Sequence, residues 1–170
     1  MRKNLIIVSL LFVGMFTACA QSKKVTKTHS TKKAVTSTKS VVKITSLTMR
    51  RSGCYGKCPE YSITINSNGM AKYTGGRNAE LQGVFEKNIG PENAQKLLQE
   101  CANDRIDTCA DMYKVRFVDL PGLHFTFTIN GKEKRVMNAH AGPSYFITIS
   151  EEVDRLGMPD GSWTKGGIKN

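Results

Sequence analysis

Two cysteines separated by three residues are the most distinctive chemical feature of this 170-residue chain. Cys54 and Cys58 are close enough in sequence for their sulfurs to meet, and Gly56 between them permits the sharp bend that this requires. A disulfide here would close only a short ring, so its contribution to stability would be modest. Its main effect would be to hold Tyr55, Gly56 and Lys57 rigidly, and we identify these tip residues as a candidate contact surface.

Cys101 and Cys109 form a second candidate pair. A bridge between them would tie the end of a predicted helix to the loop that follows it. The four cysteines allow three different pairings, and the sequence alone does not exclude the crossed ones.

The same thiols suggest an enzymatic alternative, a thiol–disulfide redox protein that uses Cys54 and Cys58. Catalysts of this type stabilise a thiolate, commonly at a helix N-terminus, and space their cysteines two residues apart. Here three residues intervene and a predicted strand follows. A structural disulfide is therefore favoured over redox catalysis.

Metal binding is not predicted. A zinc site would have to combine the Cys54 and Cys58 thiolates with His124 or His140, but the histidines lack ligand spacing relative to each other. The sequence also contains neither the serine elbow of a hydrolase nor a phosphate-binding loop, so we predict no catalytic residue and no cofactor. A calcium site is disfavoured because three aspartates after the first predicted helix lack the required loop pattern and glutamate; these are Asp104, Asp107 and Asp111.

The N-terminus determines which cysteine chemistry is available. Two basic residues, Arg2 and Lys3, precede an apolar run from Leu5 to Phe16 that is short for a membrane span. The run ends at Thr17-Ala18-Cys19, and the whole segment resembles a bacterial lipoprotein signal. We therefore predict a signal peptide over residues 1–18 and a lipid on Cys19. A retained membrane helix, or a signal cut elsewhere, is the alternative.

Two residues near the predicted cleavage site refine this interpretation. The aromatic Phe16, where lipoprotein signals usually carry leucine, resembles the looser signals of the Bacteroidetes. The segment after Cys19 begins with Ala20 and has no acidic cluster. In this it resembles signals that direct lipoproteins to the periplasmic face of the outer membrane. Export to an oxidising compartment makes disulfides the default expectation for the remaining four cysteines.

The formal net charge of +11 is unevenly distributed. Residues 20–43 carry seven lysines and no acidic residue, whereas residues 44–170 carry 16 basic and 14 acidic residues. The segment 19–43 is therefore predicted to be a lipidated, disordered tether, because its lysines alternate with serine, threonine and valine without a regular period. The nearly neutral remainder excludes nucleic acid as the expected partner.

The remainder, residues 44–170, is predicted to be a single domain. Residues 61–65 alternate apolar and polar side chains, which indicates a half-buried strand. A three-residue loop ending in Gly69 at positive φ would set Ile65 opposite Ala71. Two further strands are predicted at residues 41–49 and 81–89.

A helix is predicted to begin at Pro91, since proline fits the first helical position. Its apolar residues recur at helical spacing and form one stripe that includes Cys101, so this thiol is expected to face the core. The stripe consists of Ala94, Leu97, Leu98, Cys101 and Ala102.

The second half repeats this order. Residues 123–129 alternate, Asn130-Gly131 makes a turn, and Pro143 opens a second helix. The apolar residues predicted to line one side of this helix are Tyr145, Ile149, Val153 and Leu156. The succession of hairpin, helix, hairpin and helix predicts an α+β fold, with an antiparallel β-sheet built from hairpins and two helices packed on one face.

One segment resembles a known family. The run from Cys54 through Gly56 and Cys58-Pro59 into the strand at Tyr61 and the turn at Asn68-Gly69 is similar to the bacterial domain of unknown function 6438. The resemblance covers roughly Thr45 to Leu156. That family is common in lipoproteins and has no known activity, so the resemblance implies a fold neighbourhood and no catalytic residues. Cys101 and Cys109 are not part of the motif.

Together these observations favour a non-enzymatic, lipid-anchored envelope protein. Its expected partners are the membrane, through the lipid on Cys19, and another envelope protein, a peptide or cell-wall material. The expected contact surface is the disulfide-held tip or the uncovered face of the sheet. The alternative is the periplasmic redox protein described above.

Overall fold

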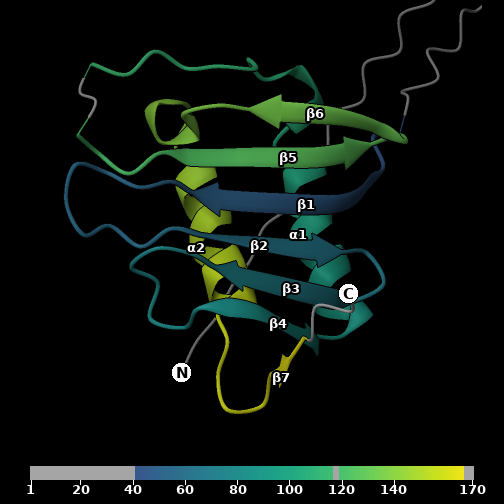
Figure 1. Cartoon of the computed structure of the whole chain (residues 1–170). Coiled ribbons are helices and arrows are strands. Elements are labelled where there is room, and N and C mark those ends of the chain that lie inside the picture. The colour runs from purple at the N-terminus through teal and green to yellow at the C-terminus, as the bar shows by residue number, and fades with distance from the viewer. Residues whose placement is uncertain (1–40, 117–118, 167–170) are drawn as a thin grey trace, which may run out of the picture. The chain divides into compact units, whose positions relative to one another are not determined.

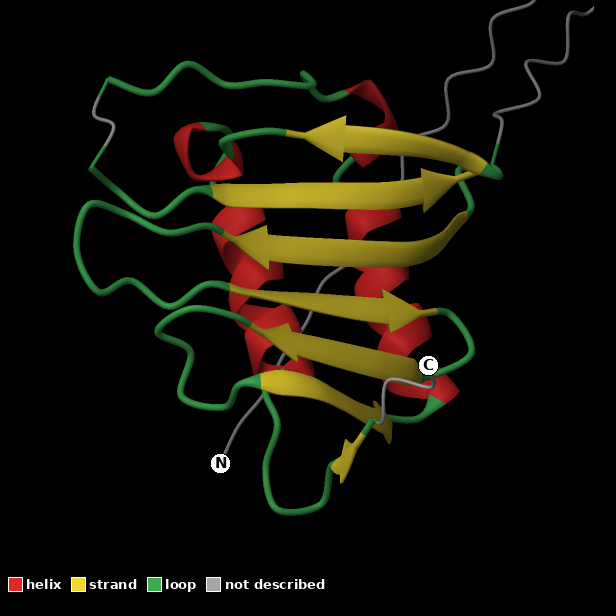
Figure 2. Ribbon diagram, viewed as in Figure 1, coloured by secondary structure: helices red, strands yellow, loops and turns green. Residues whose placement is uncertain are grey.

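The computed structural model describes residues 41–116 and 119–166. The predicted signal peptide, Cys19 and the tether up to residue 40 lie outside the described residues. Within them the chain forms a seven-stranded antiparallel sheet with two helices packed behind it (Figure 1). The predicted α+β class, with both helices on one face, is confirmed (Figure 2). None of the described helices is long and apolar enough to cross a membrane.

The first strand, β1 (Ile44–Arg51), lies in the middle of the sheet. Both halves of the chain pair with it: β2 on one side and β5 on the other. The sheet order is β6-β5-β1-β2-β3-β4-β7. The remaining strands are β2 (Tyr61–Asn66), β3 (Met70–Gly75), β4 (Gly83–Asn88), β5 (Leu123–Ile129), β6 (Lys132–Val136) and β7 (Thr164–Lys165).

The hairpin registers follow from their turn residues. Gly69 has a φ of 89°, and Ile65 lies opposite Ala71, as the three-residue loop predicts. At the second hairpin Asn130 and Gly131 have φ values of 50° and 77°, the left-handed pair that a two-residue turn requires. Both registers keep the apolar side chains on the helix side of the sheet.

The core lies between the sheet and the helices α1 (Pro91–Asn103) and α2 (Tyr145–Gly157). All five residues of the predicted α1 stripe are buried. In α2 the fully buried aromatic residue is Phe146 rather than Tyr145, and its ring stacks on Phe125 at 5.6 Å between centroids. Such an aromatic pair contributes about 0.5–1.5 kcal/mol beyond its buried area. The packing of Phe146 on Phe125 holds α2 against the sheet.

The strand directions give the sheet two distinct ends. The chain enters β1 at one end, on the right in Figure 1, and the β1–β2 loop leaves it at the other. The β3–β4 loop and the segment entering β5 lie at the same end as the β1–β2 loop. The candidate cysteine tip is therefore neighboured by two further loops.

Candidate functional site

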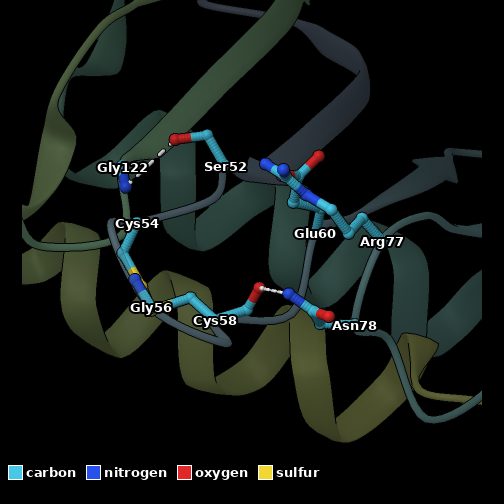
Figure 3. The surroundings of a disulfide bond; sticks show 8 residues. All are labelled: Ser52, Cys54, Gly56, Cys58, Glu60, Arg77, Asn78 and Gly122. Atoms are coloured by element: carbon cyan, nitrogen blue, oxygen red, sulfur yellow. Dashed lines mark hydrogen bonds and ion pairs between the residues drawn. A yellow bond between two sulfur atoms is a disulfide. The ribbon is translucent and has the colours of Figure 1, made fainter.

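The β1–β2 loop, residues 52–60, carries the first cysteine pair (Figure 3). Cys54 and Cys58 form a disulfide with their Cα atoms 5.5 Å apart. The Gly56 N–H donates to Cys54 Sγ at 3.3 Å, which tightens the bend inside the ring. The side chain of Tyr55 points into solvent and is 96% exposed. The loop therefore presents an aromatic ring on a covalently closed turn.

Both neighbouring loops brace this disulfide loop. On one side, the Ser52 N–H donates to the Gly122 carbonyl at 3.0 Å, and the Gly122 N–H donates to Ser52 Oγ at 3.1 Å. On the other side, Asn78 Nδ2 donates to the Cys58 carbonyl at 3.4 Å (Figure 3). These bonds satisfy backbone groups that have no partner in the sheet, so the loop is restrained at both of its ends.

An ion pair on the β3–β4 side adds to this bracing. Arg77 Nε donates to Glu60 Oε1 at 3.0 Å, and the backbones of Glu60 and Arg77 are also hydrogen-bonded at 2.9 Å. Gly53 lies against the same carboxylate, because a Cβ added there would clash with Glu60 Oε1. A side chain at position 53 would therefore require the flexible end of Glu60 to shift.

A half-buried polar cluster anchors the base of the loop to α2. Arg51 and Tyr61, the residues that flank the loop, lie opposite each other in the register of β1 and β2. Both donate to Asp154: Arg51 Nη2 at 2.7 Å and the Tyr61 hydroxyl at 2.8 Å. Arg51 also donates to Ser150 Oγ at 3.3 Å. Burial, and then the hydrogen bond to the Asp154 carboxylate, raises the pKa of Tyr61 well above its usual range, so its hydroxyl remains a donor.

Comparison with known proteins places this arrangement in a family. The sequence profile described as "Domain of unknown function (DUF6438)" matches residues 45–157, well over half of the chain. The chain belongs to the DUF6438 family. No curated protein and no solved structure matches it. The DUF6438 match runs from β1 to the end of α2, so it includes the disulfide loop, both bracing loops and Asp154.

The second cysteine pair of this DUF6438 domain differs from the expectation. Cys101 and Cys109 are free thiols, not a disulfide, and the bridge from the helix end to the following loop is not formed. Cys101 is fully buried on α1, and burial raises its pKa to about 12. Burial also raises the pKa of the half-buried Cys109 thiol. Neither sulfur has the depressed pKa of a catalytic cysteine.

The histidines lie beside the bracing loop without forming a metal site. A Cβ added at Gly122 would touch both His124 Nε2 and Ser52 Oγ, so these two atoms flank the same backbone position. His124 Nδ1 accepts the Asn138 N–H at 3.2 Å, which leaves the proton of the neutral ring on Nε2. His124 therefore cannot take a proton from Ser52, and the two do not form a nucleophile–base pair. His140 Nδ1 likewise accepts a backbone N–H, from Leu123 at 3.3 Å.

The metal ligands considered from the sequence do not converge in the described part of the chain. The sulfurs of Cys54 and Cys58 are bonded to each other and are not available as thiolate ligands. Among the described residues, no group of three or more histidine, cysteine or acidic residues is placed to hold an ion. Two of the aspartates are paired with cations instead: Asp107 with Arg105 and Asp111 with Lys134.

Sequence reasoning missed the anchor at Asp154. Alternation along the flanking strands placed Tyr61 inward, and the same pattern would place Arg51 inward, opposite it. A charged residue at an inward position signals a buried partner, and this signal was available in the sequence. The identity of the partner was not, because 93 residues separate Tyr61 from Asp154.

Proposed function

We propose that this DUF6438 protein is a lipid-anchored, non-enzymatic binding module of the cell envelope, which contacts another protein, a peptide or cell-wall material through its disulfide loop. The observation that carries the proposal is the exposure of Tyr55 on a restrained loop. Ordering a flexible loop on binding costs conformational entropy, whereas a loop closed by a disulfide has already lost part of its backbone freedom. Tyrosine is also among the residues that contribute most to protein interfaces.

The direction of β1 supports the same function. A strand of eight residues spans about 26 Å, and the chain enters it at the end opposite to the disulfide loop. An anchor preceding β1 would therefore attach at the far end from Tyr55. The loop would thus be presented away from the point of attachment.

The redox alternative is the second candidate. It draws support from the positions of Cys54 and Cys58, which are both partly exposed. However, the loop leads into β2 rather than into a helix N-terminus, so the helix dipole that commonly stabilises a catalytic thiolate is not supplied there. Alkylation followed by mass spectrometry, before and after mild reduction, tests this candidate. Redox cycling requires Cys54 and Cys58 to become labelled in a fraction of the protein isolated from cells.

Site-specific photocrosslinking tests the binding function. A photoreactive phenylalanine analogue replaces Tyr55 in the full chain, and the matched control replaces Asn68, which is exposed in the β2–β3 loop at the opposite end of the sheet. We expect a discrete adduct from position 55 and none from position 68. The adduct should weaken when Cys54 and Cys58 are both serine. Equal adducts from both positions, or none from position 55, would contradict the proposal.

The anchor is tested separately. Cys19→Ser or globomycin should cause accumulation of the unprocessed precursor, since both block maturation at the lipidated cysteine. A matched variant, Cys109→Ser, should be processed normally because that residue belongs to the folded domain. A Cys19→Ser protein of unchanged size and membrane association would contradict the anchor.

A further inference from the structure

Four polar residues form a row across the solvent face of the sheet, next to the disulfide loop. His124 pairs with Arg50, Arg50 with Ser62, and Ser62 with Thr74, on four neighbouring strands. Their chain neighbours, such as Met49 and Tyr73, are buried on the helix side, so these four side chains lie on the opposite, open face.

The donors of this row are not used within the described part of the chain. The Arg50 guanidinium has no ion pair there, and the hydroxyls of Ser62 and Thr74 have no hydrogen-bond partner. Farther from the loop the pattern differs: Thr48 bonds to Thr64 at 2.9 Å. The polar side chains near the loop are therefore available to a ligand, whereas several farther away satisfy one another.

The surface is hollowed at the same place. A depression of about 160 Å³ is lined by Arg50, Ser62 and Thr74, which is enough space for a small ion. Glu60 and Arg51 also border it, but their charges are compensated. Glu60 is paired with Arg77, and Arg51 is paired with Asp154. Arg50 is therefore the unpaired charge of the depression.

We propose that this row binds an oxyanion, a carboxylate or a phosphate group, on the ligand that the disulfide loop contacts. Arg50 supplies the charge and a planar set of N–H donors, the geometry that suits both groups. Ser62 and Thr74 supply hydroxyl donors from the next two strands. The inference rests on the proposed binding function, because it specifies the chemistry of the ligand for that surface.

His124 provides a reporter beside the site. It faces Arg50 across the strand pair and His140 from the 3-10 helix Ala139–Ala141. Burial, then the nearby guanidinium of Arg50 and His140, lowers the pKa of His124. An anion bound at Arg50 would offset the positive charge and raise that pKa again.

The test is a titration of the full chain, purified in detergent, with inorganic phosphate and with acetate at constant ionic strength. Nuclear magnetic resonance should show saturable shifts at the amides of Arg50, Ser62 and Thr74 and an increase in the pKa of His124. Arg50→Gln should weaken binding about tenfold, as expected for the loss of a charge-assisted contact. Arg50 is exposed, so this variant should fold normally, which the same spectra verify.

Arg135→Gln is the matched control. Arg135 is also exposed on a strand, but it is paired with Glu133. Its replacement should leave anion binding unchanged. Shifts that do not saturate, or equal weakening by the two substitutions, would overturn the inference, because they would show only a diffuse attraction to surface cations.

The two anions separate the possible sources of the ligand. Tighter binding of phosphate assigns the site to phosphate esters, and tighter binding of acetate assigns it to carboxylates such as those of peptides. Failure of both anions, with the Tyr55 adducts intact, would refute the oxyanion site and leave the binding function standing. Anion binding without Tyr55 adducts would support the oxyanion site and refute binding through the disulfide loop.

Discussion

The two cysteines of each pair in the DUF6438 domain are close in sequence, but the two pairs lie in different environments. Cys54 and Cys58 lie in a loop outside the sheet ladder and form a disulfide, whereas Cys101 belongs to the buried stripe of α1 and remains a thiol with Cys109. The first pair shapes a surface, whereas in the second pair Cys101 lies in the core and Cys109 packs at its edge. Spacing in the sequence is therefore a weaker guide to pairing than the helical or strand pattern that contains each cysteine.

The largest expected effect is a charge placed at Cys101. Cys101→Asp should lower the free energy of unfolding by at least about 3 kcal/mol, because the buried carboxylate would have no partner. Cys109→Asp is the matched control and should cost much less, since its side chain is only half buried. Urea unfolding measures both. Cys101→Ala, expected to cost about 1 kcal/mol, keeps the comparison available if the aspartate variant does not fold.

Loss of the Cys54–Cys58 disulfide should have the next largest effect. Replacing both cysteines by serine should lower the free energy of unfolding by about 2 kcal/mol, the value expected for so short a ring. Reductant should destabilise the wild-type protein equally and should not affect the double variant. An unfolding midpoint that reductant leaves unchanged would contradict the assignment of this pair as the stabilising one.

The anchor at the loop base should contribute slightly less. Asp154→Asn should cost about 1–2 kcal/mol, because it removes the charge that Arg51 and Tyr61 share in a half-buried position. Hydrogen exchange should increase in residues 52–60 and remain unchanged near Cys101. Glu152→Gln, two residues away on the same helix and in an ion pair with exposed Arg155, should change stability by less than about 0.5 kcal/mol.

Acidification should have the smallest effect on the free energy of unfolding. The contribution of His124, near the disulfide loop, and that of Asp107, near Cys109, should be lost in different pH ranges. Burial, then Arg50 and His140, lowers the pKa of His124, so the folded state favours its neutral form. This stabilisation is complete above the unfolded value of 6.5 and is lost as pH falls through the lower folded pKa. Near Cys109, the hydrogen bond from Arg105 lowers the pKa of Asp107, so its contribution declines only below 3.8.

Unfolding measured between pH 7.5 and 5 checks this separation. His124→Gln should flatten the pH dependence in that range, because the variant has no ionisable group at this position. Asp107→Asn should leave it unchanged. A wild-type stability that does not decrease over the range would contradict a neutral His124.

Local features of the fold were predictable from the sequence. Gly69 fixed the register of the first hairpin through its positive φ, and the helical spacing around Leu97 and Cys101 identified the buried face of α1. Short-range geometry determines both features, so composition and spacing are sufficient. The short spacing of Cys54 and Cys58 favoured their disulfide, but the sequence did not exclude the crossed pairings.

Features that depend on distant residues were not predictable. The sequence did not show that β5 pairs with β1, because the two strands are brought together only when the sheet forms. For the same reason it did not reveal Asp154 as the partner of Arg51. Phe146 rather than Tyr145 is buried because of the rotation of α2 about its axis. The packing of Phe146 against Phe125 determines this rotation.

The central position of β1 also affects how the chain folds as it is made. This strand is synthesised first in the domain, but its partner β5 begins 72 residues after its last residue. Until then one edge of β1 can pair with β2 while the other has no partner, and unpaired edges recruit other chains. Contacts over such long sequence separations also slow folding. A nascent chain arrested before Leu123 would therefore be prone to aggregate through β1, and factors that hold the chain unfolded would protect it during this interval.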